Sequence, residues 1–256
     1  MNAGAAGAPG ADVAGGAAIT PTSALRRSMI TITLMLATII YALDMTIANV
    51  ALPHMQGSFS TTQDQISWVI TSYIVATAIT TLLVGRLAEL MGRRRLQLLA
   101  VAGFALTSVL CGLTETLPQM VAARILQGVF GAPLIPLSQA ILLDINPRHK
   151  HGSAMAIWGM GVMLGPILGP TLGGYLTDLY HWRLIFLINV PVCAVALLGA
   201  YAFVPEAETT SKRHFDWLGF ASLALVIGTL QTMLDRGERL DWLESPEVLI
   251  ELAIIC

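Results

Sequence analysis

Charge is what this 256-residue sequence has least of. Only 12% of its residues are Asp, Glu, Lys or Arg, while 55% are hydrophobic, and the mean hydropathy is +0.71. Soluble globular domains carry about 25% charged residues, so the composition excludes an ordinary soluble domain. Because long apolar runs cross a bilayer as helices, we predict an all-α polytopic membrane protein. The net charge of −2 says nothing about nucleic acid, but the sequence has no basic block of the kind that binds it, so we expect no nucleic-acid partner.

Cysteine is also scarce, and its placement excludes several kinds of site. Cys111, Cys193 and Cys256 all lie in apolar runs without a paired spacing. Such residues are small buried hydrophobes more often than disulfides or metal ligands. His149 and His151 could in principle bind a metal, but a solvated loop end explains them better. We therefore expect no metal and no cofactor, and no nucleophile–base spacing supports an enzyme.

Apolar runs recur at regular intervals, separated by short loops. About 20 apolar residues suffice to cross a bilayer. On this basis we place seven spans at 30–51, 67–88, 96–113, 119–143, 153–176, 184–204 and 217–234. An eighth apolar run begins near Val248 and holds only about nine residues, fewer than a crossing needs. The first run is longer than the apolar region of a signal peptide, so we expect it to be retained.

The basic residues predict the orientation, since Lys and Arg favour cytoplasmic loops. With the N-terminus inside, three basic residues face outward: Arg183, Arg236 and Arg239. Ten face the cytoplasm: Arg26, Arg27, Arg86, Arg93, Arg94, Arg95, Arg148, Lys150, Lys212 and Arg213. We therefore predict a cytoplasmic N-terminus.

Two charges lie deep inside complete spans, Asp44 in the first and Arg124 in the fourth. Charges in a bilayer are costly and usually functional, and a direct pair or a shared aqueous cavity is their cheapest arrangement. Arginine does not deprotonate in proteins, whereas a carboxylate exchanges its proton. We expect Asp44 to carry a proton and Arg124 to set the electrostatic field around it. The alternative is that Asp44 only hydrogen-bonds between helices.

Three uncharged polar residues of the spans are candidates for a substrate cavity: Asn49, Tyr73 and Gln127. Asn49 continues a polar stripe that begins at Asp44, and Tyr73 stands among hydroxyl residues of the second span. The alternative is that such side chains only join helices.

The stretch Gly85-Arg86-Leu87-Ala88-Glu89-Leu90-Met91-Gly92-Arg93-Arg94-Arg95 follows the second span. A glycine turn, an acid near the helix end and a basic cluster beyond it suit a charge-relay gate. The candidate residues of this gating loop are Gly85, Glu89, Gly92, Arg93 and Arg94. The alternative is that the arginines only follow the orientation rule.

Glycine recurs every fourth residue in the fifth span, at Gly161, Gly165, Gly169 and Gly173. This spacing places the glycines on one helix face and lets two backbones approach closely. Pro166 and Pro170 each remove a backbone donor and bend the helix. A bent, smooth-faced helix suits a seal that rocks between two states, although ordinary tight packing would use the same residues.

Several of these stretches resemble motifs of the major facilitator superfamily. Residues 85–95 are similar to its loop 2–3 signature, with Glu89 where Asp is usual and Leu90 where a basic residue is usual. The other similar stretches are 43–53 (an acidic first-helix motif of the 14-span drug:proton antiporters), 124–131 (a motif with a membrane-embedded arginine), 161–174 (the antiporter motif of exporters), and 181–191 and 234–237 (connecting segments of that subfamily).

The resemblance covers residues 28–256 and implies a major-facilitator-type bundle. Its divisions would be a disordered cytoplasmic tail (1–28), a six-helix transport bundle (29–204), a cytoplasmic linker (205–216), and a seventh span with the start of an eighth (217–256). Because the superfamily rocks two six-helix halves around one site, we expect the chain to need a C-terminal half.

The implied function is proton-coupled efflux of amphipathic, often cationic, drugs across a bacterial inner membrane. The proton gradient would supply the energy, and a periplasmic adaptor protein would be a candidate partner, as in some related pumps. The alternatives are a narrow-range exporter of one metabolite or antibiotic, and a non-transporting membrane scaffold or remnant.

Overall fold

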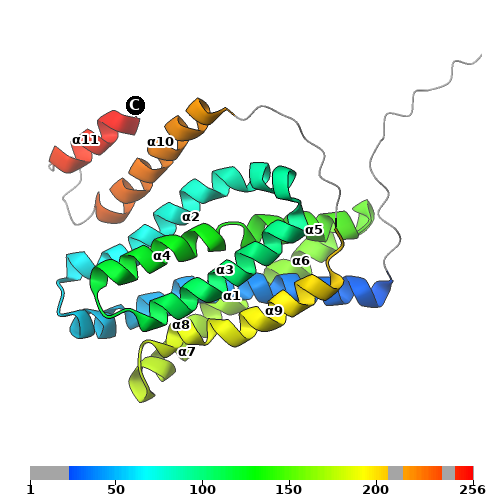
Figure 1. Cartoon of the computed structure of the whole chain (residues 1–256), viewed down its shortest axis with the longest axis horizontal. Helices are drawn as coiled ribbons and strands as arrows, with labels where there is room; N and C mark the ends of the chain where they lie inside the picture. Colours follow the sequence, from blue (N-terminus) through cyan, green and yellow to red (C-terminus); the bar gives the residue numbers. More distant parts are fainter. Residues whose placement is uncertain (1–22, 207–215, 238–245, 256) are drawn as a thin grey trace, which may run out of the picture.

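The computed structural model describes residues 23–206, 216–237 and 246–255, and every regular element within these ranges is helical (Figure 1). The predicted all-α fold is therefore confirmed. The elements are α1 (Ala24–Phe59), α2 (Gln63–Met91), α3 (Arg93–Leu113), α4 (Leu117–Gly131), α5 (Leu134–Ile145), the 3-10 turn η1 (Arg148–Lys150), α6 (His151–Val162), α7 (Leu164–Leu179), α8 (Leu184–Leu187), α9 (Asn189–Phe203), α10 (Trp217–Arg236) and α11 (Pro246–Ile255).

Seven helical stretches of the described residues are long and apolar enough to cross a membrane, and each coincides with a predicted span. The helices extend beyond the predicted limits, because an apolar pattern marks only the part of a helix that lipid would cover. Thus α1 begins at Ala24, inside the predicted tail, and continues to Phe59. The rest of that tail, most of the linker 205–216 and the stretch 238–245 lie outside the described residues.

Helices α1 and α2 begin at residues whose side chains satisfy free backbone groups. The Ser23 side chain accepts a hydrogen bond from the backbone N–H of Arg26 at the start of α1. At the start of α2, Thr62 and Gln65 form a reciprocal capping box. Side chains of this kind replace the hydrogen bonds that the first helical turn lacks.

The fourth, fifth and sixth spans are each interrupted, whereas the first three are continuous helices. The breaks fall at Ala132–Pro133, at Met163 and at Ile188. In each of these spans, a proline lies three residues after the last residue of the break. These prolines are Pro136, Pro166 and Pro191. A proline removes the backbone bond to the residue four positions earlier, so each span loses a bond beside its break. The predicted disturbance at Pro166 is confirmed, while α7 runs through Pro170.

The first six spans form one bundle, in which α1 packs against α7 and α9, α2 against α4, and α3 against α4 and α9 (Figure 1). Its interior combines apolar clusters with buried polar residues. Helix α10 lies along α2 on the outside of this bundle, and α11 packs on α10. The seventh span therefore adds to the six-span bundle without entering its core.

Candidate functional site

Asp44 of α1 and Arg124 of α4 form a direct ion pair at the centre of the bundle. Arg124 Nη1 donates to Asp44 Oδ2 at 2.6 Å, and both side chains are 0% exposed. Of the two arrangements expected from the sequence, the structure has the direct pair. Burial removes water from both charges, so the pair depends on protein hydrogen bonds to offset the lost hydration.

The guanidinium of Arg124 has further partners from two other helices. Its Nε donates to the backbone carbonyl of Val69 at 3.2 Å, and its Nη1 also donates to Gln127 Oε1 at 2.8 Å. Its central carbon lies 4.1 Å from the ring centroid of Tyr73 and 5.7 Å from that of Phe186. Aromatic faces attract a cation, more strongly where water is excluded, so the site holds the arginine by charge, hydrogen bonds and rings together.

The second oxygen of Asp44 accepts from two side-chain amides. Gln127 Nε2 donates to Oδ1 at 3.1 Å, and Asn189 Nδ2, from α9, donates at 2.9 Å. Ser108 Oγ accepts from Gln127 Nε2 at 2.8 Å and from Asn189 Nδ2 at 3.4 Å, and the Cys111 thiol donates to Gln127 Oε1 at 3.3 Å. An ionised carboxylate only accepts hydrogen bonds, so the donors around Asp44 suit its charged form.

Three members of this cluster were not predicted: Ser108, Cys111 and Asn189. Asn189 is 1% exposed and lies in an apolar span. The rule that singled out Asp44, that polar groups inside spans need a use or a partner, would also have found Asn189. The sequence gave no sign that Asn189 reaches the Asp44 carboxylate, or that Ser108 and Cys111 bond the amides beside it.

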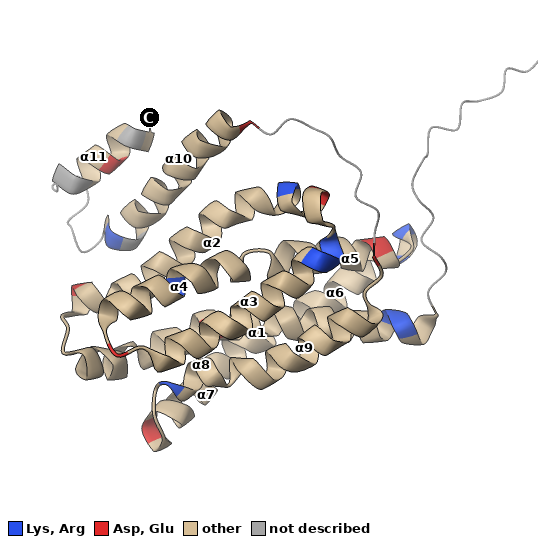
Figure 2. Ribbon diagram, viewed as in Figure 1, with Lys and Arg blue, Asp and Glu red and all other residues tan. Residues whose placement is uncertain are grey.

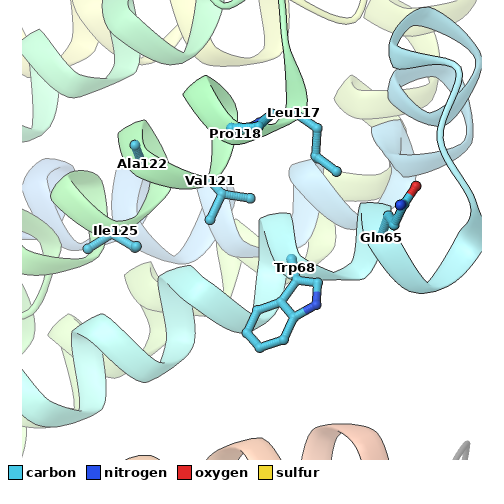
Figure 3. Close-up of a pocket in the computed structure, with 7 residues that line it drawn as sticks. All are labelled: Gln65, Trp68, Leu117, Pro118, Val121, Ala122 and Ile125. Carbon is cyan, nitrogen blue, oxygen red and sulfur yellow. The ribbon is translucent and has the colours of Figure 1, made fainter.

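The three predicted cavity residues do not gather in one cavity. Tyr73 and Gln127 are fully buried beside the Asp44–Arg124 pair, whereas Asn49 is exposed and donates to the carbonyl of Met45 in its own helix. Their contact with a substrate stays a prediction. A separate groove of about 330 Å³ lies between the starts of α2 and α4 (Figure 3), lined by Gln65, Trp68, Leu117, Pro118, Val121, Ala122 and Ile125.

The predicted gating stretch takes a different form from a loop. Gly85 and Glu89 both lie in the continuous helix α2, and Gly85 falls within the predicted span 67–88. A Cβ on Gly85 would meet no atom within 4 Å. The turn is at Gly92, whose φ of 84° favours glycine. Its N–H donates to the carbonyl of Ala88 and ends α2.

The acid of this stretch pairs within its own helix, whereas two of its arginines contact other helices. Glu89 pairs with Arg86, one helical turn earlier, at 3.1 Å. Arg93 pairs with Asp144 at the end of α5. Arg94 donates to the carbonyl of Tyr201 in α9 at 2.7 Å. The arginines therefore join α3 to α5 and α9, as a gate between helices would require.

One further acid, Glu206, follows α9 and lies beside two of these arginines. Arg95 Nε donates to Glu206 Oε1 at 2.9 Å, and Arg94 Nη1 lies 3.8 Å from its Oε2. Figure 2 shows several of the Lys and Arg positions, coloured blue on the ribbon, at this end of the bundle, where α1 begins and α2 meets α3. The predicted clustering of the basic residues on one side is thus present in the fold.

The glycine stripe of the fifth span faces α1, as close helix approach predicts. A Cβ on Gly165 would lie 2.6 Å from Ala42 Cβ, and one on Gly173 would lie 2.9 Å from Ile47 Cγ1. A Cβ on Gly169 would meet Thr46 Oγ1, and one on Gly161 would meet Met35. Thr46 Oγ1 also donates to the carbonyl of Gly165 at 3.3 Å. The stripe therefore holds the fifth span against the helix that carries Asp44.

The first six spans form a helical bundle with a buried ion pair at its centre, which is the architecture of an integral membrane protein. The model of the Major Facilitator Superfamily matches residues 34–240, and the chain belongs to that superfamily. With seven apolar spans, it is a multi-pass membrane protein.

Two curated relatives are similar to the chain in sequence, and one solved structure is similar to it in fold. It is 44% identical to "Multidrug export protein EmrB" of Escherichia coli (strain K12) over 90% of this chain and 45% of the relative. It is 40% identical to "Fatty acid resistance protein FarB" of Neisseria gonorrhoeae over the same shares. The xylose transporter XylE from E. coli superposes with a TM-score of 0.64 at 17% identity, over 84% of this chain and 58% of that one, and shows the fold.

The chain spans less than half the length of the curated relatives it matches. The six-span bundle seen here therefore corresponds to a part of those proteins.

Proposed function

We propose that this chain acts in proton-coupled export of amphipathic drugs by alternating access. The observation that carries the proposal is the fully buried Asp44–Arg124 pair. Two charges in the middle of a membrane bundle are costly to maintain, and the pair joins the first span to the fourth. The relatives named as multidrug exporters support the drug-like substrate.

The proposed cycle uses the change of charge at Asp44. A proton that binds the carboxylate from outside removes its negative charge, and Arg124 loses its ionic partner. The first and fourth spans are then free to separate, and release of the proton inside restores the pair. Transport follows because each charge state of Asp44 favours a different arrangement of the helices.

The rest of the proposed machinery follows from the same cycle. Alternating access needs a second six-helix half against which this bundle rocks. The arginine contacts around Gly92 would open and close on the cytoplasmic side. We place the chain in a bacterial inner membrane with its N-terminus inside, supported by the basic end of the bundle. A periplasmic adaptor remains a proposed partner.

A narrow-range exporter is the second candidate, and one observation favours it. FarB, which is 40% identical to this chain, is named for resistance to fatty acids, a single class of amphipathic compound. Competition between a lipophilic cation and a fatty acid for the same transport activity would separate a broad drug exporter from a fatty acid exporter.

The decisive experiment is transport in everted membrane vesicles that contain this chain together with a C-terminal six-helix half, since alternating access needs both halves. With an imposed pH gradient, we expect uptake of a fluorescent lipophilic cation that Asp44→Asn abolishes. Asp178→Asn is the matched control. Asp178 is an exposed carboxylate near the C-terminal end of α7, and it lies 3.7 Å from His54. Full pH-driven uptake in Asp44→Asn would contradict the proposal. No uptake by the unmodified chain would favour the scaffold alternative.

A further inference from the structure

Asn189 links the sixth span directly to the carboxylate of Asp44. Its Nδ2 donates to Asp44 Oδ1 at 2.9 Å and lies 3.4 Å from Ser108 Oγ. Asn189 is 1% exposed, so water does not compete for these bonds. A hydrogen bond between a neutral donor and a buried charge is stronger than one between neutral groups. Asn189 therefore responds to the charge state of Asp44.

The backbone at Asn189 is also the place where the sixth span is interrupted. Asn189 is the first residue of α9 and follows the break at Ile188. Pro191 cannot donate to the carbonyl of Leu187, so the backbone bonding that would join α8 to α9 is incomplete. A contact made at an interruption of this kind can change with a small rotation of one helical segment.

The groups around Asp44 that could titrate come from five helices. They are Tyr41 of α1, Tyr73 of α2, Cys111 of α3, Arg124 of α4 and Cys193 of α9. Arg124 stays charged in proteins, and the amides of Asn189 and Gln127 do not titrate. A donor such as Asn189 therefore changes the proton affinity of Asp44 without taking a proton itself.

We propose that Asn189 is a positioning residue that couples protonation of Asp44 to the position of the sixth span. While Asp44 is ionised, Nδ2 holds α9 against α1. When a proton binds Oδ1, it occupies one of the two lone pairs that accept from Gln127 and Asn189, the lost negative charge weakens the N–H···O bond from Asn189, and α9 is released. This inference rests on the proposed proton-coupled function and names the helix that would respond.

The test is an infrared pH titration of the purified chain, which needs no transport. The C=O stretching band of a protonated buried carboxyl group reports Asp44 and should be missing in Asp44→Asn. In Asn189→Leu, which keeps the number and branching of the side-chain heavy atoms and removes the donor, we expect the midpoint of this band to rise by about one to two pH units. Asn146→Leu is the matched control, because its amide donates only to Leu142 of its own helix at 2.9 Å. An unchanged midpoint in Asn189→Leu would overturn the inference.

Hydrogen exchange in the unmodified chain provides a second readout in case Asn189→Leu does not fold. After correction for the intrinsic rate, amide exchange in α9 should accelerate through the infrared midpoint as pH falls. Equal protection of α9 above and below that midpoint would also overturn the inference. Failure of the proposed function is recognised separately, since it appears as absent transport while the infrared titration and the exchange still change together.

Discussion

The molecule contains ion pairs in two very different settings, the centre of the bundle and its basic end. The Asp44–Arg124 pair is 0% exposed on both sides. At the basic end, Arg93–Asp144 is 40% and 37% exposed, and Arg95–Glu206 is 71% and 54% exposed. The chemistry is the same, a guanidinium beside a carboxylate, but only the first pair has lost its water.

This difference in exposure means that the buried pair must keep both of its charges, whereas the exposed pairs can change partners. Removing one member of a buried pair leaves an unpaired charge in an apolar interior. Exposed pairs contribute about 0–1 kcal/mol, because water replaces the missing partner. The centre is therefore suited to storing a charge state, and the basic end to contacts that form and break as helices move.

The largest effect is expected from Arg124→Gln. We expect a loss of about 3–5 kcal/mol in the free energy of unfolding, because Asp44 remains buried without its counter-ion. SDS titration in mixed micelles measures it. The double variant Asp44→Asn with Arg124→Gln should recover most of the loss, since neither charge is then present. A double variant that is no more stable than Arg124→Gln alone would contradict the idea that the unpaired charge of Asp44 causes the loss.

A smaller effect is expected from Gly165→Val, which extends the comparison to uncharged atoms at the centre. The added side chain would overlap Ala42 of α1, and overpacking of this kind costs about 1–3 kcal/mol. Gly174→Ala is the control, because a Cβ at that position meets no atom within 4 Å. Thermal unfolding in detergent should rank Gly165→Val below Gly174→Ala. The reverse order would mean that α7 does not rely on its close approach to α1.

The smallest effect is expected from Arg93→Gln at the basic end. Its pair with Asp144 is partly exposed, so the change in unfolding free energy should lie between about 0 and 1 kcal/mol. The difference from the unmodified chain should shrink further at 1 M salt, where screening acts within about 3 Å. A loss as large as that of Arg124→Gln would place both regions in the same class and remove the distinction between them.

The sequence predicted the spans and the central pair because both depend on local properties. Helix length in a membrane follows from the apolar run, and a charge such as Asp44 stands out within such a run. The glycine spacing also predicted a close-packed face, which the structure places against α1. These features need no knowledge of which helices are neighbours.

The partners of these residues could not be predicted, because they come from distant parts of the chain. Asn189 reaches Asp44 across 145 positions, and Glu206 reaches Arg95 across 111. Which helices meet is decided by the packing of the whole bundle, which a motif does not describe. Gly85 and Gly92 differ for a local reason: glycine permits a turn but does not require one, so Gly85 stays inside α2 while Gly92 ends it.

The distance between Asp44 and Arg124 along the chain also has a consequence for how the protein is made. The two residues are 80 positions apart. At about 5–20 residues per second, the first span waits on the order of 4–16 s before the arginine that neutralises its carboxylate has been synthesised. During that interval Asp44 must stay protonated, remain near water, or be sheltered by the insertion machinery. The early life of this protein in the membrane thus depends on how Asp44 is accommodated before its arginine has been made.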